Sequence, residues 1–93
     1  MKSETEIVGW LREKVAKETQ KALSDISLET PFASLGLDSI VIVTLAADLE
    51  EWLNISLDPT VFWEYPTIHQ LTEWIVAEKL GSQVAGIAPG HGP

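Results

Sequence analysis

The chain has 93 residues, of which 45% are hydrophobic, so it can build the core of one small domain with little room for a deep pocket. Fourteen acidic against six basic residues give a formal net charge of −8, which argues against nucleic acid or an anionic membrane as a partner. There is no cysteine, so disulfides, thiolate metal sites and a thiol nucleophile are excluded.

The remaining bulk features concern metals and location. His69 and His91 are the histidines, and neither belongs to a recognisable ligand set, so no metal site is predicted. No apolar run approaches the roughly 18 residues of a membrane span. The acidic start MKSETEIV does not resemble a secretion signal, so the protein is predicted to be cytoplasmic.

The first predicted element is a helix over residues 4–21. Ser3 and Glu6 have the spacing of a capping box, in which each side chain accepts a hydrogen bond from the other residue's backbone. Apolar residues at helical spacing follow, among them Leu11 and Val15. One face of this helix is therefore expected to contribute to the core.

Residues 24–36 are predicted to form a long ordered loop, because polar residues, Pro and Gly surround isolated apolar side chains. Gly36 is expected to supply a backbone turn that other residues resist.

The run IVIV at 40–43 would favour a strand if taken alone. Its context predicts a helix over 39–53 instead, because Asp38 is a strong N-cap and apolar residues follow at helical spacing. This stripe consists of Ile42, Leu45, Ala46, Leu49 and Leu53. Other apolar residues near the helix start lie off the stripe, and two readings stay open for them: a contact surface, or packing beneath the long loop.

Two further helices are predicted. Pro59 suits the first turn of a short helix over 59–64, which Tyr65-Pro66 ends. Thr67 is expected to cap a last helix that ends near residue 80, with Gln70 completing a second capping box. The four tryptophans all fall in helical segments, and packing in or beside the core is their expected role.

The predicted fold class is therefore all-α, a four-helix bundle with three longer helices and one short third helix. Residues 1–80 form the predicted domain. Residues 81–93 are rich in Gly and Pro and are predicted to be a flexible tail or linker.

Ser39 falls in the first turn of the second predicted helix, beside its cap. A serine nucleophile needs a base and oxyanion donors, and the chain does not supply them: the nucleophile-elbow glycines are absent and His69 is expected to be a solvated helix residue. A second cap beside Asp38 would be redundant. The remaining role is a handle, since a phosphate ester on this hydroxyl would lie at the positive end of the helix dipole.

"LGLDSI" at 35–40, followed by "LAADLEEWLNISLDPTVFWEYPTI" at 45–68, resembles acyl carrier proteins and the carrier domains of polyketide and nonribosomal peptide synthases. The likeness covers about residues 5–80 and includes an acidic second helix and a "YPT" step. It implies a right-handed four-helix bundle and a non-catalytic carrier with no catalytic or metal-binding residues. The "GLDS" and "FWEYPT" motifs look closest to polyketide or mixed polyketide–peptide carriers.

For Ser39 the resemblance implies attachment of 4′-phosphopantetheine, derived from coenzyme A, by a separate phosphopantetheinyl transferase. Acyl intermediates would then travel as thioesters on this arm. The implied partners are the transferase, a ketosynthase, an acyltransferase or acyl-activating ligase, and other synthase enzymes, with the carrier itself a monomer. The positions matched to partner recognition are Leu37, Asp38, Ile40, Val41, Thr44, Ala47, Asp48, Glu51, Val61 and Phe62.

Several alternatives stay open. The chain could be a peptidyl carrier of a nonribosomal peptide synthetase, or an unmodified helical interaction module. A serine hydrolase is a further candidate. It predicts turnover of simple esters by the unmodified chain, and no such turnover is expected. The sequence does not reveal the acyl cargo, the pathway product, the apo or holo state, or whether the chain is a discrete protein or part of a larger synthase.

Overall fold

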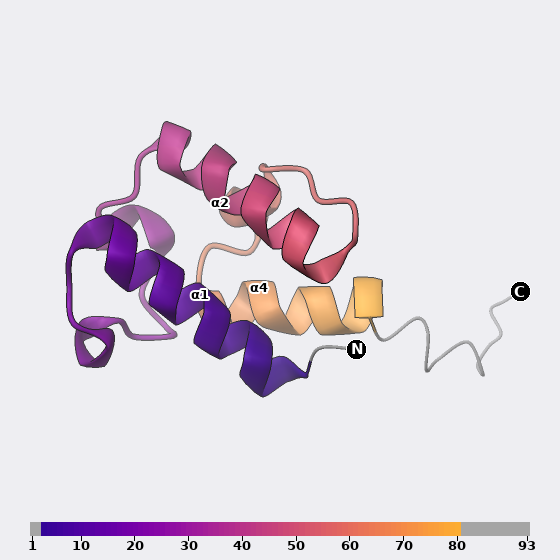
Figure 1. The fold of residues 1–93 in the computed structure, drawn as a ribbon, viewed down its shortest axis with the longest axis horizontal. Helices are drawn as coiled ribbons and strands as arrows, with labels where there is room; N and C mark the ends of the chain where they lie inside the picture. Colours follow the sequence, from indigo (N-terminus) through magenta and orange to yellow (C-terminus); the bar gives the residue numbers. More distant parts are fainter. Residues whose placement is uncertain (1–2, 81–93) are drawn as a thin grey trace, which may run out of the picture.

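The computed structural model describes residues 3–80, and this part of the chain consists of helices joined by turns and loops (Figure 1). Its elements in chain order are α1 (Glu4–Thr19), η1 (Leu23–Asp25), η2 (Phe32–Leu35), α2 (Ser39–Leu53), α3 (Val61–Glu64), α4 (Ile68–Trp74) and η3 (Ile75–Leu80). The predicted tail over 81–93 lies outside the described residues. Within the described range, no helix is both long enough and apolar enough to cross a bilayer.

The capping box predicted at the start of α1 is confirmed. The Ser3 hydroxyl accepts the Glu6 backbone N–H at 3.2 Å, and the Glu6 carboxylate accepts the Ser3 backbone N–H at 2.8 Å. The helix ends at Thr19, two residues earlier than predicted, because Gln20 adopts a left-handed conformation with φ 58° that closes the last turn.

The connection between α1 and α2 is ordered, as expected, but it contains two 3₁₀ turns, η1 and η2, that the sequence pattern did not reveal. The Arg12 guanidinium of α1 donates to the Leu23 carbonyl at 2.8 Å and holds the first of them. Gly36 ends the second with φ 92°, a conformation that favours glycine, which confirms the expected turn. This connection is called the α1–α2 loop below (residues 20–38).

The third and fourth helices begin differently from their predicted patterns. Helix α3 starts at Val61, after a turn in which Thr60 donates two hydrogen bonds to Asp58 and lowers the pKa of that carboxyl. In α4 the Thr67 hydroxyl accepts the Gln70 backbone N–H as predicted, but the Gln70 side chain accepts from the Thr67 hydroxyl at 3.3 Å instead of the Thr67 backbone. Only half of the second capping box therefore forms.

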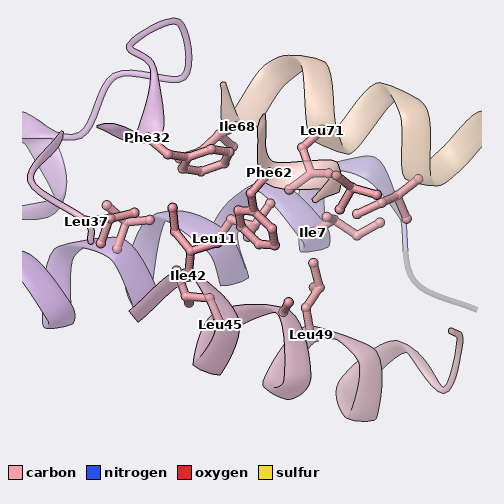
Figure 2. Close-up of a cluster of buried hydrophobic side chains, with 14 of the residues drawn as sticks. Ile7, Leu11, Phe32, Leu37, Ile42, Leu45, Leu49, Phe62, Ile68 and Leu71 are labelled. Carbon is pink, nitrogen blue, oxygen red and sulfur yellow. The ribbon is translucent and has the colours of Figure 1, made fainter. Parts of the chain in front are cut away.

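The core lies where all four α-helices and the α1–α2 loop meet (Figure 2). The loop contributes Phe32 and Leu37, and α3 contributes Phe62, whose ring centroid is 5.0 Å from that of Phe32. The helices contribute apolar side chains that are at most 3% exposed: Ile7, Leu11, Ile42, Leu45, Leu49, Ile68 and Leu71. The predicted stripe of α2 is buried in full, so the helical reading of the IVIV run is confirmed.

Thr72 of α4 is fully buried, and its hydroxyl has no hydrogen-bond partner within the described residues. A buried hydroxyl without a partner loses its hydration and gains nothing in return. Replacing Thr72 by valine is therefore expected to raise the free energy of unfolding by about 1 kcal/mol. Urea denaturation should show a higher midpoint with an unchanged slope. A lower midpoint would mean that the hydroxyl is satisfied in solution.

Candidate functional site

Ser39 is the first residue of α2, and its side chain is exposed. The turn ending at Gly36 and the buried Leu37 fix the approach of the chain to this helix. Asp38 caps it, with its carboxylate accepting the Val41 backbone N–H at 2.9 Å. The cap at Asp38 and the turn at Gly36 fix the position of the Ser39 backbone. The Ser39 hydroxyl makes no hydrogen bond within residues 3–80 and is exposed, so it remains accessible.

The environment of Ser39 suits a negatively charged substituent. The first amides of a helix have no partner inside the helix, and they carry the positive end of its dipole. The cap at Val41 engages the third of these amides, which leaves those of Ser39 and Ile40 directed toward the serine end. The negative charge of a phosphodiester on the Ser39 oxygen would thus lie near these backbone N–H groups and the positive end of the helix dipole, which stabilise it. The residues present therefore fit a phosphopantetheine group.

The described chain does not provide a base for Ser39. His69 lies at the start of α4, where Nδ1 is 2.9 Å from Oε2 of Glu29 and Nε2 is 3.2 Å from Oε2 of Glu73. Both ring nitrogens are thus engaged by carboxylates, which raise the pKa of His69 above its usual 6.5. The histidine was expected to be merely solvated, whereas it joins the α1–α2 loop to α4.

The exposed face of α2 extends from Ser39 along the helix. Ile40, Thr44, Ala47 and Glu51, all expected to contact partners, are exposed, and Ile40 is 77% exposed. Asp38 is exposed as well, while Val41 and Asp48 are half-buried. The four exposed positions within α2, Ile40, Thr44, Ala47 and Glu51, form a continuous strip on the side of the helix opposite the buried stripe, whereas Val41 packs against the core.

Three residues expected to contact partners lie in the core instead. Leu37 is 7% exposed, Val61 5% and Phe62 1%, because each fills space between the helices and not the surface above Ser39. Their side chains are therefore covered in this structure, and contact with a partner at these three positions stays a prediction.

Sequence reasoning missed two exposed apolar residues. Val43 is 50% exposed and extends the strip of α2, three residues after Ile40. Trp63 of α3 is 53% exposed, which corrects the expectation that all four tryptophans pack in or beside the core. The signal for Val43 was present, since it lies off the buried stripe within the IVIV run.

An open depression of about 450 Å³ lies further along α2. It is lined by Ala47, Asp48, Glu50, Glu51 and Ile55. Glu50 also has a structural role, because its carboxylate accepts the Leu57 backbone N–H at 2.7 Å and orders the turn after α2. The strip around Ser39 thus changes from apolar at Ile40 and Val43 to acidic near the end of the helix.

Comparison with known proteins identifies this arrangement. The profile of the family described as "Phosphopantetheine attachment site" matches residues 9–75. The chain belongs to this family of phosphopantetheine-binding carriers. It is accordingly a carrier and not a catalyst, and its cofactor is phosphopantetheine.

Individual relatives include both synthase segments and separate proteins. The chain is 39% identical over 80 residues to the 6-methylsalicylic acid synthase of Penicillium expansum, with 82% of this chain and 4% of the synthase covered. It is 34% identical over 73 residues to the acyl carrier protein TtuC of Teredinibacter turnerae, covering 78% of this chain and 84% of the relative. The chain spans only 2% to 4% of the length of the first curated relatives that it matches.

Solved structures confirm the fold. A free-standing peptidyl carrier protein of Acinetobacter baumannii superposes with a TM-score of 0.76 at 38% identity, over 82% of this chain and 95% of that one. The predicted all-α four-helix architecture is therefore confirmed by a related carrier as well as by the helices described above.

Proposed function

We propose that Ser39 is the residue that takes up 4′-phosphopantetheine, and that the protein carries acyl intermediates between the enzymes of polyketide or mixed polyketide–peptide biosynthesis. The observation that supports Ser39 is its exposed hydroxyl at the capped start of α2, which makes no hydrogen bond within residues 3–80. The chain also belongs to a family that is described by the attachment of phosphopantetheine. The similarity to polyketide synthases supports the pathway.

The carrier's own residues have positioning roles in this function. Asp38 and the turn at Gly36 hold the Ser39 oxygen at the rim of the bundle, where a transferase can supply the base that residues 3–80 do not provide. When bound, the arm supplies a terminal thiol that holds an acyl group as a thioester. Tethering of this kind raises the effective concentration of the intermediate at each partner's active site.

The proposed partners are a phosphopantetheinyl transferase and, in the polyketide case, a ketosynthase and an acyltransferase or acyl-activating ligase. Asp48 and Glu51 of α2 would attract basic surfaces on these enzymes. The exposed apolar residues beside Ser39 would then make the close contact. We propose further that the carrier acts as a monomer in the cytoplasm.

The test is the mass of the intact protein after incubation with coenzyme A, Mg²⁺ and a broad-specificity phosphopantetheinyl transferase. A gain of one phosphopantetheine is expected. Folded protein that gains no mass would instead support an unmodified helical module.

A peptidyl carrier is the second candidate, because a free-standing peptidyl carrier protein shares 38% identity and the same fold. Isolating the protein from cells that also express its neighbouring pathway enzymes separates the two. An acyl thioester on the arm supports the polyketide assignment, whereas an aminoacyl thioester supports the peptidyl one.

The exposed strip of α2 allows a matched test of recognition. Replacing Ile40 by glutamine keeps the charge and the helix but removes an apolar contact next to Ser39, so kcat/KM for loading is expected to fall about tenfold. Leu23→Gln is the control, because Leu23 is 47% exposed but lies in η1, outside the strip. Equal kinetics for the two variants would contradict a docking role for Ile40.

A further inference from the structure

His69 is held between two carboxylates that come from different parts of the fold. Glu29 belongs to the α1–α2 loop and contacts Nδ1, while Glu73 lies one turn along α4 and contacts Nε2. A neutral imidazole has a single N–H and can donate to one acceptor at a time. The two contacts, at 2.9 and 3.2 Å, are therefore both hydrogen bonds only when the ring is an imidazolium.

The charges around the ring favour that form. The hydrogen bond to Glu29 is the largest cause of the raised pKa of His69, followed by the charge of Glu73 and that of Glu29. No lysine or arginine occurs between residues 22 and 78, so the loop after Lys21, α2, α3 and α4 offer no cation to compete for these carboxylates. Glu29 and Glu73 are the charged groups that act on the ring, and no charged residue of the adjacent α1 is among the causes of the raised pKa.

Two backbone hydrogen bonds near His69 also join the α1–α2 loop to the segment at the start of α4, and this contact region is called the seam below. The His69 backbone N–H donates to the Leu28 carbonyl at 3.1 Å, and the Phe32 backbone N–H donates to the Pro66 carbonyl at 2.7 Å. Figure 2 shows Phe32 reaching from the loop toward Ile68 of α4. Beyond Phe32 the chain passes through η2 to Asp38 and Ser39, so the seam anchors the segment that presents the serine.

We propose that the His69 imidazolium is a positioning residue that clamps the α1–α2 loop onto α4, so that the segment leading to Ser39 is held more firmly when His69 is protonated. The charge-assisted form of this contact is fully present below pH 6.5, the usual pKa of the ring. It is lost as the pH rises through the raised pKa of the folded protein, because the neutral ring carries no charge and can donate to only one of the two carboxylates. Its influence on Ser39 rests on the proposed function, whereas the clamp itself does not.

The expected effect is local. The side chains of His69, Glu29 and Glu73 are 44%, 70% and 62% exposed, and exposed ion pairs add little to global stability. Loss of the clamp should therefore increase local opening of the loop and leave global unfolding nearly unchanged. The size expected for one exposed pair is a change of about two- to five-fold in the opening equilibrium.

Amide hydrogen exchange measures this opening directly. The protection factor of the Phe32 amide, corrected for the intrinsic pH dependence of exchange, should fall about two- to five-fold as His69 titrates. NMR of the His69 ring gives the pKa in the same samples. Phe32 protection that stays constant through the titration overturns the clamp.

Variants separate the clamp from a general structural role. His69→Lys stays charged to about pH 10 and should keep Phe32 protected across the range, while His69→Gln should show reduced protection at every pH. Glu29→Gln should abolish the pH dependence, because it removes the partner on the loop. Glu73→Gln is the matched control: it lowers the pKa of His69 but keeps the contact to the loop, so protection should be lost at lower pH. Wild-type behaviour in His69→Gln or Glu29→Gln would also overturn the proposal.

The consequence for Ser39 is tested by the pH profile of loading. The kcat/KM of the wild type divided by that of His69→Lys cancels the transferase's own pH dependence. This ratio should fall about two- to five-fold as His69 deprotonates. A constant ratio overturns the influence on Ser39. If neither the wild type nor His69→Lys were loaded, the result would count against the proposed function instead. Hydrogen exchange of the Phe32 amide would then still test the clamp.

Discussion

Ser39→Ala is expected to abolish uptake of phosphopantetheine completely and to leave the fold intact. The variant removes the oxygen to which the group would be attached, and the methyl side chain of alanine cannot form a phosphate ester. The Ser39 side chain is exposed and makes no hydrogen bond within the described residues, so removal of its hydroxyl should change the free energy of unfolding by less than about 0.5 kcal/mol. Intact mass after the transferase reaction and urea denaturation measure the two effects.

Ser34→Ala is the matched control for this variant. Ser34 is also exposed and lies in η2, five residues before Ser39, but it does not begin a long helix. It should load like the wild type. Full loading of Ser39→Ala would show that another residue is modified, whereas loss of loading in both variants would indicate a general effect on recognition of the loop.

The helices were predictable because several local signals agreed. At α2 the cap at Asp38 and the 3.6-residue spacing from Ile42 to Leu53 outweighed the β-branched run, and the structure has the predicted bounds. At Gly36 the loop context predicted a turn, and the left-handed φ confirms it. Ser39 could be singled out for the same reason, since its position follows from the cap and from the start of the helix.

The direction of individual side chains was less predictable, because it depends on how the helices pack. Leu37 lies off the stripe of α2, yet the turn at Gly36 directs it into the core. Val61 and Trp63 lie in the same four-residue helix, and only tertiary contacts decide that the first is buried and the second exposed. The partners of His69 were also hidden, because Glu29 is forty residues away in the sequence.

Phe62→Ala is expected to cost about 3–5 kcal/mol, a large part of the stability of a small domain. Phe62 is 1% exposed and packs against Phe32 of the α1–α2 loop, and Figure 2 shows it in the core near Leu11 of α1. A four-residue helix cannot persist through its own hydrogen bonds, so α3 depends on the burial of such side chains.

The neighbouring aromatic residue provides the comparison for Phe62. Trp63 belongs to the same helix but is 53% exposed, so Trp63→Ala removes a larger side chain and should cost only about 1 kcal/mol. Urea denaturation of both variants, followed by far-UV circular dichroism, gives the two values. If Trp63→Ala were the more damaging, α3 would have to be held by its outer face, and the core around Phe32 would not depend on Phe62. With the expected order, α3 is fixed from the inside, and its exposed tryptophan remains free to contact a partner.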